Sequence, residues 1–283
     1  MNFFKEHSLP ELGKRWTAFK HPDATRPPTA RAIFLDSTIE QMPKLFGAVA
    51  VDRKLNGEYG PSLVVGNDGG APSAVQLALK MGGEESLEKW ENGEYAPTKL
   101  IFGRSKAKKA AKKMNPLKDS EAHKGSRLMK ATDALINEKL GRKSESPITM
   151  EEFAARPNTV KLAFNVFNLT KNELMLITSD NYPAMPVSLA MLASMAGAPT
   201  FVDVEFGEEK FCSGSKINPY PLDAVFKLYK AVNEKGTEAD FRFFLGEPAK
   251  TEPVESSKDL VFDRPAFPKS SVIPWLSGKI VRV

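Results

Sequence analysis

The sequence contains very little cysteine and histidine. Its 283 residues include one cysteine, Cys212, and three scattered histidines, His7, His21 and His123. A single thiol excludes a disulfide framework within the chain and a zinc site built from several cysteines. The histidines are too far apart for the spacing of a metal site, so we expect neither a metal nor a cofactor.

Long hydrophobic runs are absent as well. No apolar stretch approaches the length of about 18 residues that a membrane-spanning helix needs. The N-terminus, MNFFKEHSLPELGKRW, lacks the apolar core and small residues of a cleaved signal peptide. These absences favour a soluble, cytoplasmic protein and leave open a secretion route that uses no cleaved signal.

Motifs that mark several enzyme classes are missing too. The chain has no Walker A loop, no G-x-G-x-x-G fingerprint, no H-E-x-x-H helix, no EF-hand loop and no G-x-S-x-G elbow. Its apolar fraction of 41% is nevertheless sufficient for a packed core. Any chemistry must therefore come from a less common arrangement of residues.

Positive charge is concentrated in one stretch, residues 104–143, which we call the basic segment. It carries thirteen Lys/Arg and four Asp/Glu, a net +9, and subtracting this from the total of +5 leaves the other 243 residues at −4. Such a segment suits an anionic lipid membrane, where each basic residue contributes about 1 kcal/mol, or an acidic protein surface. No aromatic residue separates the lysines of its core, which argues against single-stranded nucleic acid. The alternative is a solubilising insertion. The expected contact residues are Lys108, Lys109, Lys112 and Lys113.

Apolar patterns alternate between strands and helices along the chain. We expect strands at residues 31–35, 61–65, 160–169, 173–178, 201–206, 210–212 and 240–245, and helices at 39–55, 71–81, 186–195 and 222–232. A further helix should begin near Thr149, because Glu152 three residues later completes a capping box. This alternation favours an α/β sheet.

The chain divides into three parts by composition. Residues 1–30, with four prolines, should form an N-terminal arm. Residues 31–246 should form the α/β domain, with the basic segment as a variable insertion. Residues 247–283, rich in Pro and Ser, should form a C-terminal tail that ends irregularly.

One strand leads directly into a glycine-rich turn and a helix of small residues. Residues 61–65 run into Gly66-Asn-Asp-Gly-Gly70, and Pro72 fits the first turn of the following helix. This is the layout of a nucleophile elbow, which exposes one side chain at a helix N-terminus and needs small neighbours where strand and helix approach closely. The exposed position is Asp68, whose carboxylate the helix dipole would stabilise.

At this turn the sequence resembles the patatin-like phospholipases. Their strand, G-x-S-x-G turn and helix match residues 63–71. Their "NLTTGE"-like turn, small-residue helix and D-G loop match residues 167–173, 185–202 and 211–222 in the same order. The resemblance covers residues 31–230 and implies a three-layer α/β fold with a mainly parallel sheet between helices.

The resemblance also implies a catalytic dyad, but here its two residue types are exchanged. In the family the elbow serine attacks an ester and the aspartate of the D-G motif activates it. By position these residues are Asp68 and Ser213 in this chain. The motif glycines are retained: Gly66, Gly69 and Gly70 in the elbow and Gly214 after Ser213.

The family's D-G-G-G-x-R-G oxyanion loop has no counterpart. The first strand leads instead into Leu35-Asp-Ser-Thr-Ile-Glu-Gln41, which contains neither glycine nor arginine. Loss of one oxyanion donor typically lowers the rate by about 10²–10³. Loss of the whole loop should lower it further.

Three interpretations remain open at this point. Asp68 and Ser213 could hold two loops in the family's geometry without catalysis. Asp68 could act as the nucleophile or as the base for Ser213. Residues 66–70 could resemble an elbow within a different α/β fold. Cys212, with no histidine near it in sequence, is expected to be a buried structural thiol, and Met185, Met191, Met195 and Phe201 are expected in the core.

The sequence thus favours a degenerate patatin-like protein that binds a partner or has a structural role. A membrane or an acidic protein surface would be its partner, and it would lack ordinary phospholipase activity. The alternative function is lipid acyl hydrolysis through the exchanged Asp68–Ser213 pair.

Overall fold

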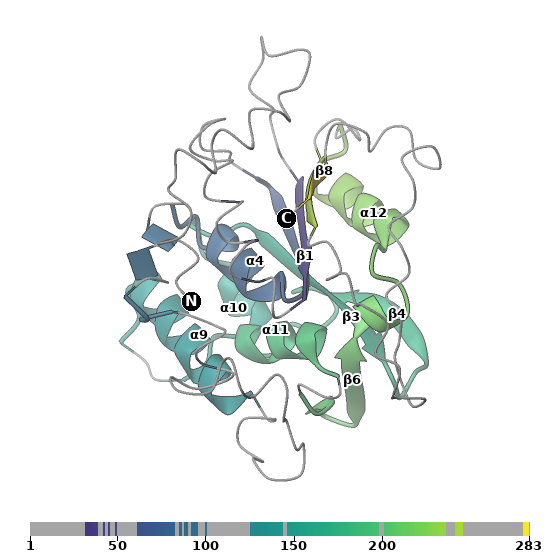
Figure 1. Cartoon of the computed structure of the whole chain (residues 1–283), viewed down its shortest axis with the longest axis horizontal. Coiled ribbons are helices and arrows are strands. Elements are labelled where there is room, and N and C mark those ends of the chain that lie inside the picture. Colours follow the sequence, from purple (N-terminus) through teal and green to yellow (C-terminus); the bar gives the residue numbers. More distant parts are fainter. Residues whose placement is uncertain are drawn as a thin grey trace, which may run out of the picture.

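A computed structural model gives the arrangement of most of the chain. It describes residues 32–38, 61–82, 125–143, 146–197, 201–235, 241–245 and 280–282, together with single positions between 42 and 100. Within this part of the chain, one β-sheet carries helices on both faces (Figure 1).

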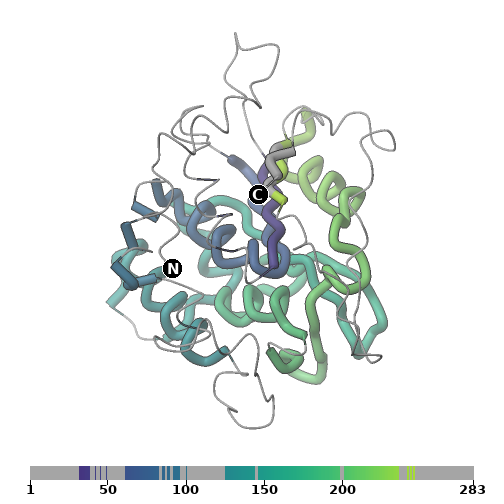
Figure 2. The backbone as a smooth tube through the Cα atoms, in the orientation of Figure 1, coloured from purple at the N-terminus to yellow at the C-terminus, as the bar shows by residue number. Residues whose placement is uncertain are grey.

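The sheet contains eight strands in the order β5-β6-β3-β2-β1-β7-β8, with β4 paired to β3. Their bounds are β1 Ala32–Ser37, β2 Leu63–Asp68, β3 Lys161–Asn168, β4 Glu173–Ile177, β5 Val204–Phe206, β6 Glu209–Ser213, β7 Phe241–Leu245 and β8 Ile280–Arg282. The strands β3, β2, β1, β7 and β8 run parallel, whereas β4 and β6 pair antiparallel with β3. The purple β1 lies at the centre of the molecule (Figure 2).

Alternating side chains of the central strands build two cores. Ile33, Val64 and Phe164 are buried on one face, together with the helices α4, α9, α10 and α11. We call this the α4 face. Phe34 and Val65 are buried on the other, the α12 face. The helices are α4 Ala71–Ala78, α9 Ser126–Lys139, α10 Met150–Ala154, α11 Val187–Met195 and α12 Leu222–Val232.

This three-layer arrangement confirms the predicted α/β fold with a mainly parallel sheet between helices. Parallel strands are covered on both faces, which explains why the central strands read as continuous apolar runs. The predicted capping box is also confirmed, since Thr149 Oγ1 accepts from the Glu152 N–H and Glu152 accepts from the Thr149 N–H. Both predicted hairpins, β3–β4 and β5–β6, are present.

Three expectations need correction. The strand β2 continues through Asp68, three residues beyond the predicted end. Helix α9 lies within the basic segment and is not among the predicted helices. Its residues Leu128, Leu135 and Ile136 are buried. The tail expected to end irregularly contributes β8, which pairs in parallel with β7.

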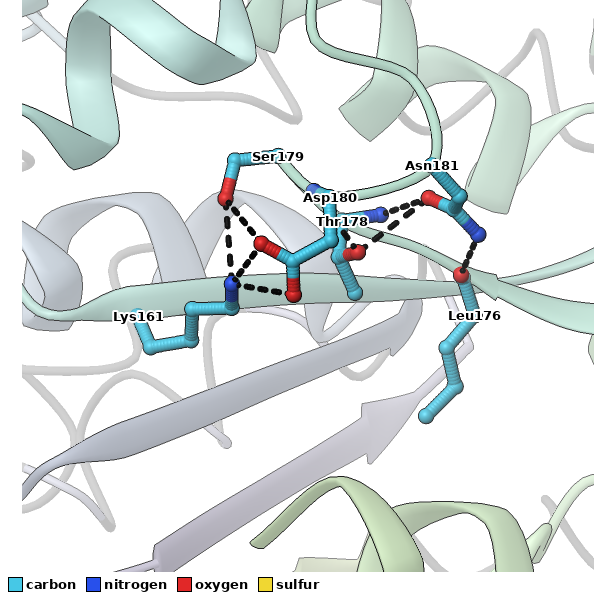
Figure 3. A network of polar contacts seen from close by, with 6 residues as sticks. All are labelled: Lys161, Leu176, Thr178, Ser179, Asp180 and Asn181. Atoms are coloured by element: carbon cyan, nitrogen blue, oxygen red, sulfur yellow. Dashed lines mark hydrogen bonds and ion pairs between the residues drawn. The ribbon is translucent and has the colours of Figure 1, made fainter. Parts of the chain in front are cut away.

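A polar turn connects β4 to α11 (Figure 3). Asn181 Oδ1 accepts from the Thr178 N–H at 2.8 Å, and Asn181 Nδ2 donates to Leu176 O at 2.9 Å. Lys161 Nζ, at the start of β3, lies 2.6 Å from both carboxylate oxygens of Asp180. These contacts fix the direction in which the chain enters α11. No helix of the described residues is long and apolar enough to cross a membrane.

Candidate functional site

The turn after β2, residues 66–70, has the backbone of a strained elbow. We call it the elbow turn. Asp68 has a φ of 46°, in the left-handed region that costs an L-residue about 1–2 kcal/mol. Gly70 then precedes the first residue of α4 as its N-cap. Asp68 is half-buried, whereas its neighbours Asn67, Gly69 and Gly70 are buried.

The close approach of α4 and β1 to the elbow turn explains why the turn needs glycine. A Cβ at Gly66 would lie 2.7 Å from the Cα of Ala71 and 2.9 Å from the Cβ of Ala74 in α4. A Cβ at Gly70 would lie 2.3 Å from the backbone oxygen of Leu35 in β1. Neither backbone can move away without disturbing the sheet, so the elbow turn tolerates no side chain at these positions.

The end of β1 lies directly against the elbow turn. The Gly69 N–H donates to the backbone oxygen of Ser37 at 2.6 Å, and the Gly70 N–H donates to Asn67 O at 2.8 Å. In a nucleophile elbow, the N–H of the residue after the nucleophile is an oxyanion donor. Here that residue is Gly69, and its N–H is already bonded to β1.

Ser213 begins a second turn, residues 213–219, which we call the Ser213 turn. Ser213 is buried, and its hydroxyl accepts from the Ser215 N–H at 3.3 Å and lies 2.8 Å from Ser215 Oγ. It thereby caps the short 3₁₀ helix η1, Gly214–Lys216. The hydroxyl of Ser213 is engaged within its own turn.

The register of β3 shows that β2 and β6 share one of its edges. Phe164 pairs with Gly66 of β2 on one edge and with β4 on the other. Val166 pairs with β4 and with Ser213 of β6, so β6 occupies the edge that β2 uses. Because β6 is antiparallel to β3 and β2 is parallel to it, β2 and β6 approach each other end to end.

This arrangement brings the two turns to the same place in the fold. Asp68 follows Gly66 by two residues, just as Val166 follows Phe164, so Asp68 and Ser213 lie at the same level along β3. Both belong to the α4 face by strand alternation. The helix η1 also contacts β2 and β3. Asp68 and Ser213, far apart in the sequence, are thus placed at adjoining strand ends.

A chain of buried polar side chains lies on the opposite face of the same strand ends. Asp36, Asn67 and Asn165 belong to β1, β2 and β3 and are each fully buried. Asn67 Nδ2 donates to Asp36 Oδ1 at 2.9 Å, and Asn165 Nδ2 donates to Asn67 Oδ1 at 3.1 Å. Sequence reasoning missed these asparagines, although polar residues within apolar parallel strands were a usable signal.

Ser37 was also missed. Ser37 pairs with Asp68 in the register of β1 and β2, and the Ser37 side chain is fully buried. Among the residues that the structure describes, none forms a hydrogen bond with Ser37 Oγ, which is costly for a buried hydroxyl. The end of β1 therefore brings a polar group beside the elbow turn.

The other candidates behave as core residues. Cys212 is buried and burial raises the pKa of its thiol, so it remains protonated and unreactive near neutral pH. Met185, Met191, Met195 and Phe201 are buried as predicted. Among the described residues, no group of three or more His, Cys, Asp or Glu side chains could hold a metal ion.

The lysines expected to contact a partner, Lys108, Lys109, Lys112 and Lys113, lie outside the described residues. The described part of the basic segment includes α9, where Arg127 and Lys130 are exposed. Other charges nearby are paired: Lys139 Nζ lies 2.6 Å from Glu85, and Lys89 Nζ lies 2.9 Å from Glu138. The exposed positive charge of α9 is therefore near its N-terminus.

No protein-family model matches the sequence, and no curated protein matches it. Solved structures of similar shape include VipD from Legionella pneumophila, with 14% identity, a TM-score of 0.47 and coverage of 78% of this chain and 50% of that chain. Full-length ExoU in complex with SpcU, from the type III secretion system of Pseudomonas aeruginosa, has 13% identity, a TM-score of 0.40 and coverage of 91% and 48%. This chain spans about half the length of these structures, and the likeness is one of overall shape.

Proposed function

We propose that the chain is a degenerate patatin-like protein that retains the family's site architecture without its acyl-hydrolase chemistry, and that it acts as a binding protein at anionic membranes. The ordered motifs of the sequence support the family. The elbow turn and the Ser213 turn, adjoining at β3, support the retained architecture. The basic segment supports the membrane.

The observation that carries the loss of chemistry is the hydrogen bond from the Gly69 N–H to Ser37 O at 2.6 Å. An ester carbonyl that becomes tetrahedral develops negative charge on its oxygen, and this charge needs preorganised donors. The donor that an elbow supplies is bonded to β1, and the glycine-rich loop that would add others is replaced by residues 35–41. The oxyanion would therefore lack both of these donors.

The side chains at the dyad positions point to the same conclusion. Asp68 is a weaker nucleophile than an activated serine, and the Ser213 hydroxyl is buried and bonded to Ser215. In the family's order the serine stands on the strained turn, which exposes it to substrate. In this chain the strained position holds the carboxylate instead.

Hydrolysis assays test the chemical part of the proposal. The purified chain is incubated with short-chain p-nitrophenyl esters and with phosphatidylcholine vesicles, beside the variants Asp68→Asn and Ser213→Ala. We expect all three proteins to release product at the rate of buffer alone. Turnover by the unmodified chain that each substitution abolishes would instead establish the alternative, an acyl hydrolase that uses the exchanged pair.

Vesicle sedimentation tests the membrane part. Vesicles with and without phosphatidylserine are mixed with the chain and with a variant in which Lys108, Lys109, Lys112 and Lys113 are alanine. At about 1 kcal/mol for each of the four lysines, the variant should bind anionic vesicles roughly 1000-fold more weakly. Added salt should steeply weaken the binding of the unmodified chain. The matched control replaces four exposed lysines elsewhere, Lys80, Lys227, Lys230 and Lys235.

Binding of the control variant should equal that of the unmodified chain. Equal loss in both variants would show that net charge, and not the basic segment, governs binding. Absence of binding to anionic vesicles would contradict the membrane proposal and would favour an acidic protein surface or a solubilising role for the segment.

A further inference from the structure

We infer that Asn67 and Asn165 form a carboxamide latch that holds the Ser213 turn against the elbow turn, so that the two halves of the site move as one unit. The inference rests on the proposed function only in treating the two turns as parts of one site. It assigns a positioning role to Asn67, which occupies a variable position of the elbow motif, and to Asn165, which lies outside the motifs.

Asn67 has the place and the bonds that such a latch requires. It directly precedes Asp68, and its side chain points to the α12 face by strand alternation. Asn67 Nδ2 donates to Asp36 Oδ1 at 2.9 Å and to the backbone oxygen of Pro219 at 3.1 Å. One carboxamide therefore joins β2 to β1 and to the end of the Ser213 turn.

Asn165 makes the second connection. Its Nδ2 donates to Asn67 Oδ1 at 3.1 Å and to the backbone oxygen of Asn218 at 3.0 Å. The two carboxamides thus bind the carbonyls of two consecutive residues of the Ser213 turn, Asn218 and Pro219. The carboxamides are also hydrogen-bonded to each other. The latch spans 152 sequence positions between Asn67 and Pro219.

Gly214 lets the turn approach the latch. A Cβ at this position would lie 2.5 Å from Asn165 Oδ1 and 2.8 Å from Asn165 Nδ2. The absence of a side chain therefore brings the backbone that follows Ser213 into contact with the Asn165 carboxamide. The glycine next to Ser213 and the asparagine in β3 form one packing unit.

Burial makes the latch cooperative. Both asparagines are fully buried, so each polar atom that loses its partner has no water to replace it. Opening the Ser213 turn would leave the carboxamides of both residues underbonded at once. The turn should therefore open rarely, and removal of either carboxamide should make it open more often.

Hydrogen exchange of the full chain, read by mass spectrometry of peptides, tests the latch. In Asn165→Ala, amides of residues 214–221 should exchange about tenfold faster, because roughly one buried hydrogen bond no longer opposes opening. Amides of β4 should keep their rates. The matched control is Asn168→Ala, an equally buried asparagine on the same strand whose Nδ2 donates to Glu209 and Tyr182.

Asn168→Ala should loosen the β3–β4 turn and leave residues 214–221 unchanged. If both variants accelerate all segments equally, the asparagines only support global stability and the latch is wrong. Unchanged exchange of residues 214–221 in Asn165→Ala would also overturn it.

Asn67→Ala provides a second route if Asn165→Ala does not fold. It should accelerate the same residues, and the double variant should exchange no faster than the faster single variant, because both carboxamides act as one unit. If the two substitutions instead accelerated exchange independently, so that their effects multiplied in the double variant, the latch would be contradicted. The two tests are independent. Ester turnover in the hydrolysis assays would overturn the proposed function, whereas the latch depends only on the exchange rates.

Discussion

The elbow turn and the Ser213 turn adjoin at β3, yet they are held in different ways. The elbow turn is shaped by its own glycines and by the strand and helix on either side of it. The Ser213 turn is short and polar and is held by side chains from strands far away in the sequence. A local structure can be recognised in a sequence motif, whereas a structure held from a distance cannot. Substitutions in the two turns should therefore have different consequences.

The largest effect is expected from Gly70→Ala in the elbow turn. Its Cβ would meet the backbone of Leu35 at 2.3 Å, and backbone in a central strand cannot shift cheaply. We expect a loss of about 3 kcal/mol or more in the free energy of unfolding, at the upper end of overpacking costs. Urea denaturation measures it. Gly82→Ala is the control, since its Cβ would meet no atom of the described residues within 4 Å apart from its chain neighbours.

A smaller and conditional effect is expected from Gly214→Ala in the Ser213 turn. The added Cβ would meet the side chain of Asn165, not a backbone, so the cost should be about 1–3 kcal/mol. In an Asn165→Ala background most of that cost should disappear. A double-mutant cycle in urea measures this coupling. Equal costs in both backgrounds would show that Asn165 does not constrain the turn.

The strain at Asp68 should appear as a difference between two variants that both lack the carboxylate. Asp68→Gly relieves the left-handed backbone, whereas Asp68→Ala keeps a Cβ at φ 46°. We expect the glycine variant to be more stable by about 1 kcal/mol. Thermal unfolding compares them, and equal stability would show that the elbow turn is not strained.

The smallest effect concerns Glu209, at the start of the strand that ends in Ser213. Ion pairing with Lys171 and a hydrogen bond from Tyr182 lower the pKa of Glu209 from 4.5. A lowered pKa stabilises the fold above the unfolded-state value, and this contribution is lost as pH falls through the folded-state pKa. Glu209→Gln should therefore be less stable at pH 7, with the difference narrowing below pH 4.5.

Unfolding measured in urea at pH 7 and at stepwise lower pH checks this expectation. A difference that stays constant across the acidic range would show that the carboxylate charge of Glu209 does not stabilise the strand. The side chain is partly exposed, so salt should also reduce the difference.

Much of the fold could be predicted from the sequence because its signals are local. The capping box at Thr149, the glycines of the elbow turn and the alternation in β3 and β4 each involve neighbours in the chain. Helix α9 could not be predicted as readily, because the charge of the basic segment obscures the helical spacing of its buried residues Leu128, Leu135 and Ile136. Strand β8 was missed because three residues carry too little pattern of their own.

The residues of the candidate site also differ in whether their signals are local in the sequence. Asp68 and Gly66 could be found because strand, turn and helix follow one another directly. The bond between the Gly69 N–H and Ser37 O could not be found, because it depends on how closely β1 approaches the turn. The same applies to Asn165, whose partners lie 98 and 53 positions away. The residues that decide what the site can do are connected through the sheet, not through the sequence.

We propose that the bond from the Gly69 N–H to Ser37 O prevents acyl-hydrolase chemistry, whichever residues stand at positions 68 and 213. The most direct test restores the family's order in the double variant Asp68→Ser, Ser213→Asp and measures hydrolysis of a short-chain p-nitrophenyl ester. An unchanged urea midpoint would show that the variant is folded. We expect the folded variant to release product no faster than the unmodified chain. Turnover that depends on the new serine would contradict it.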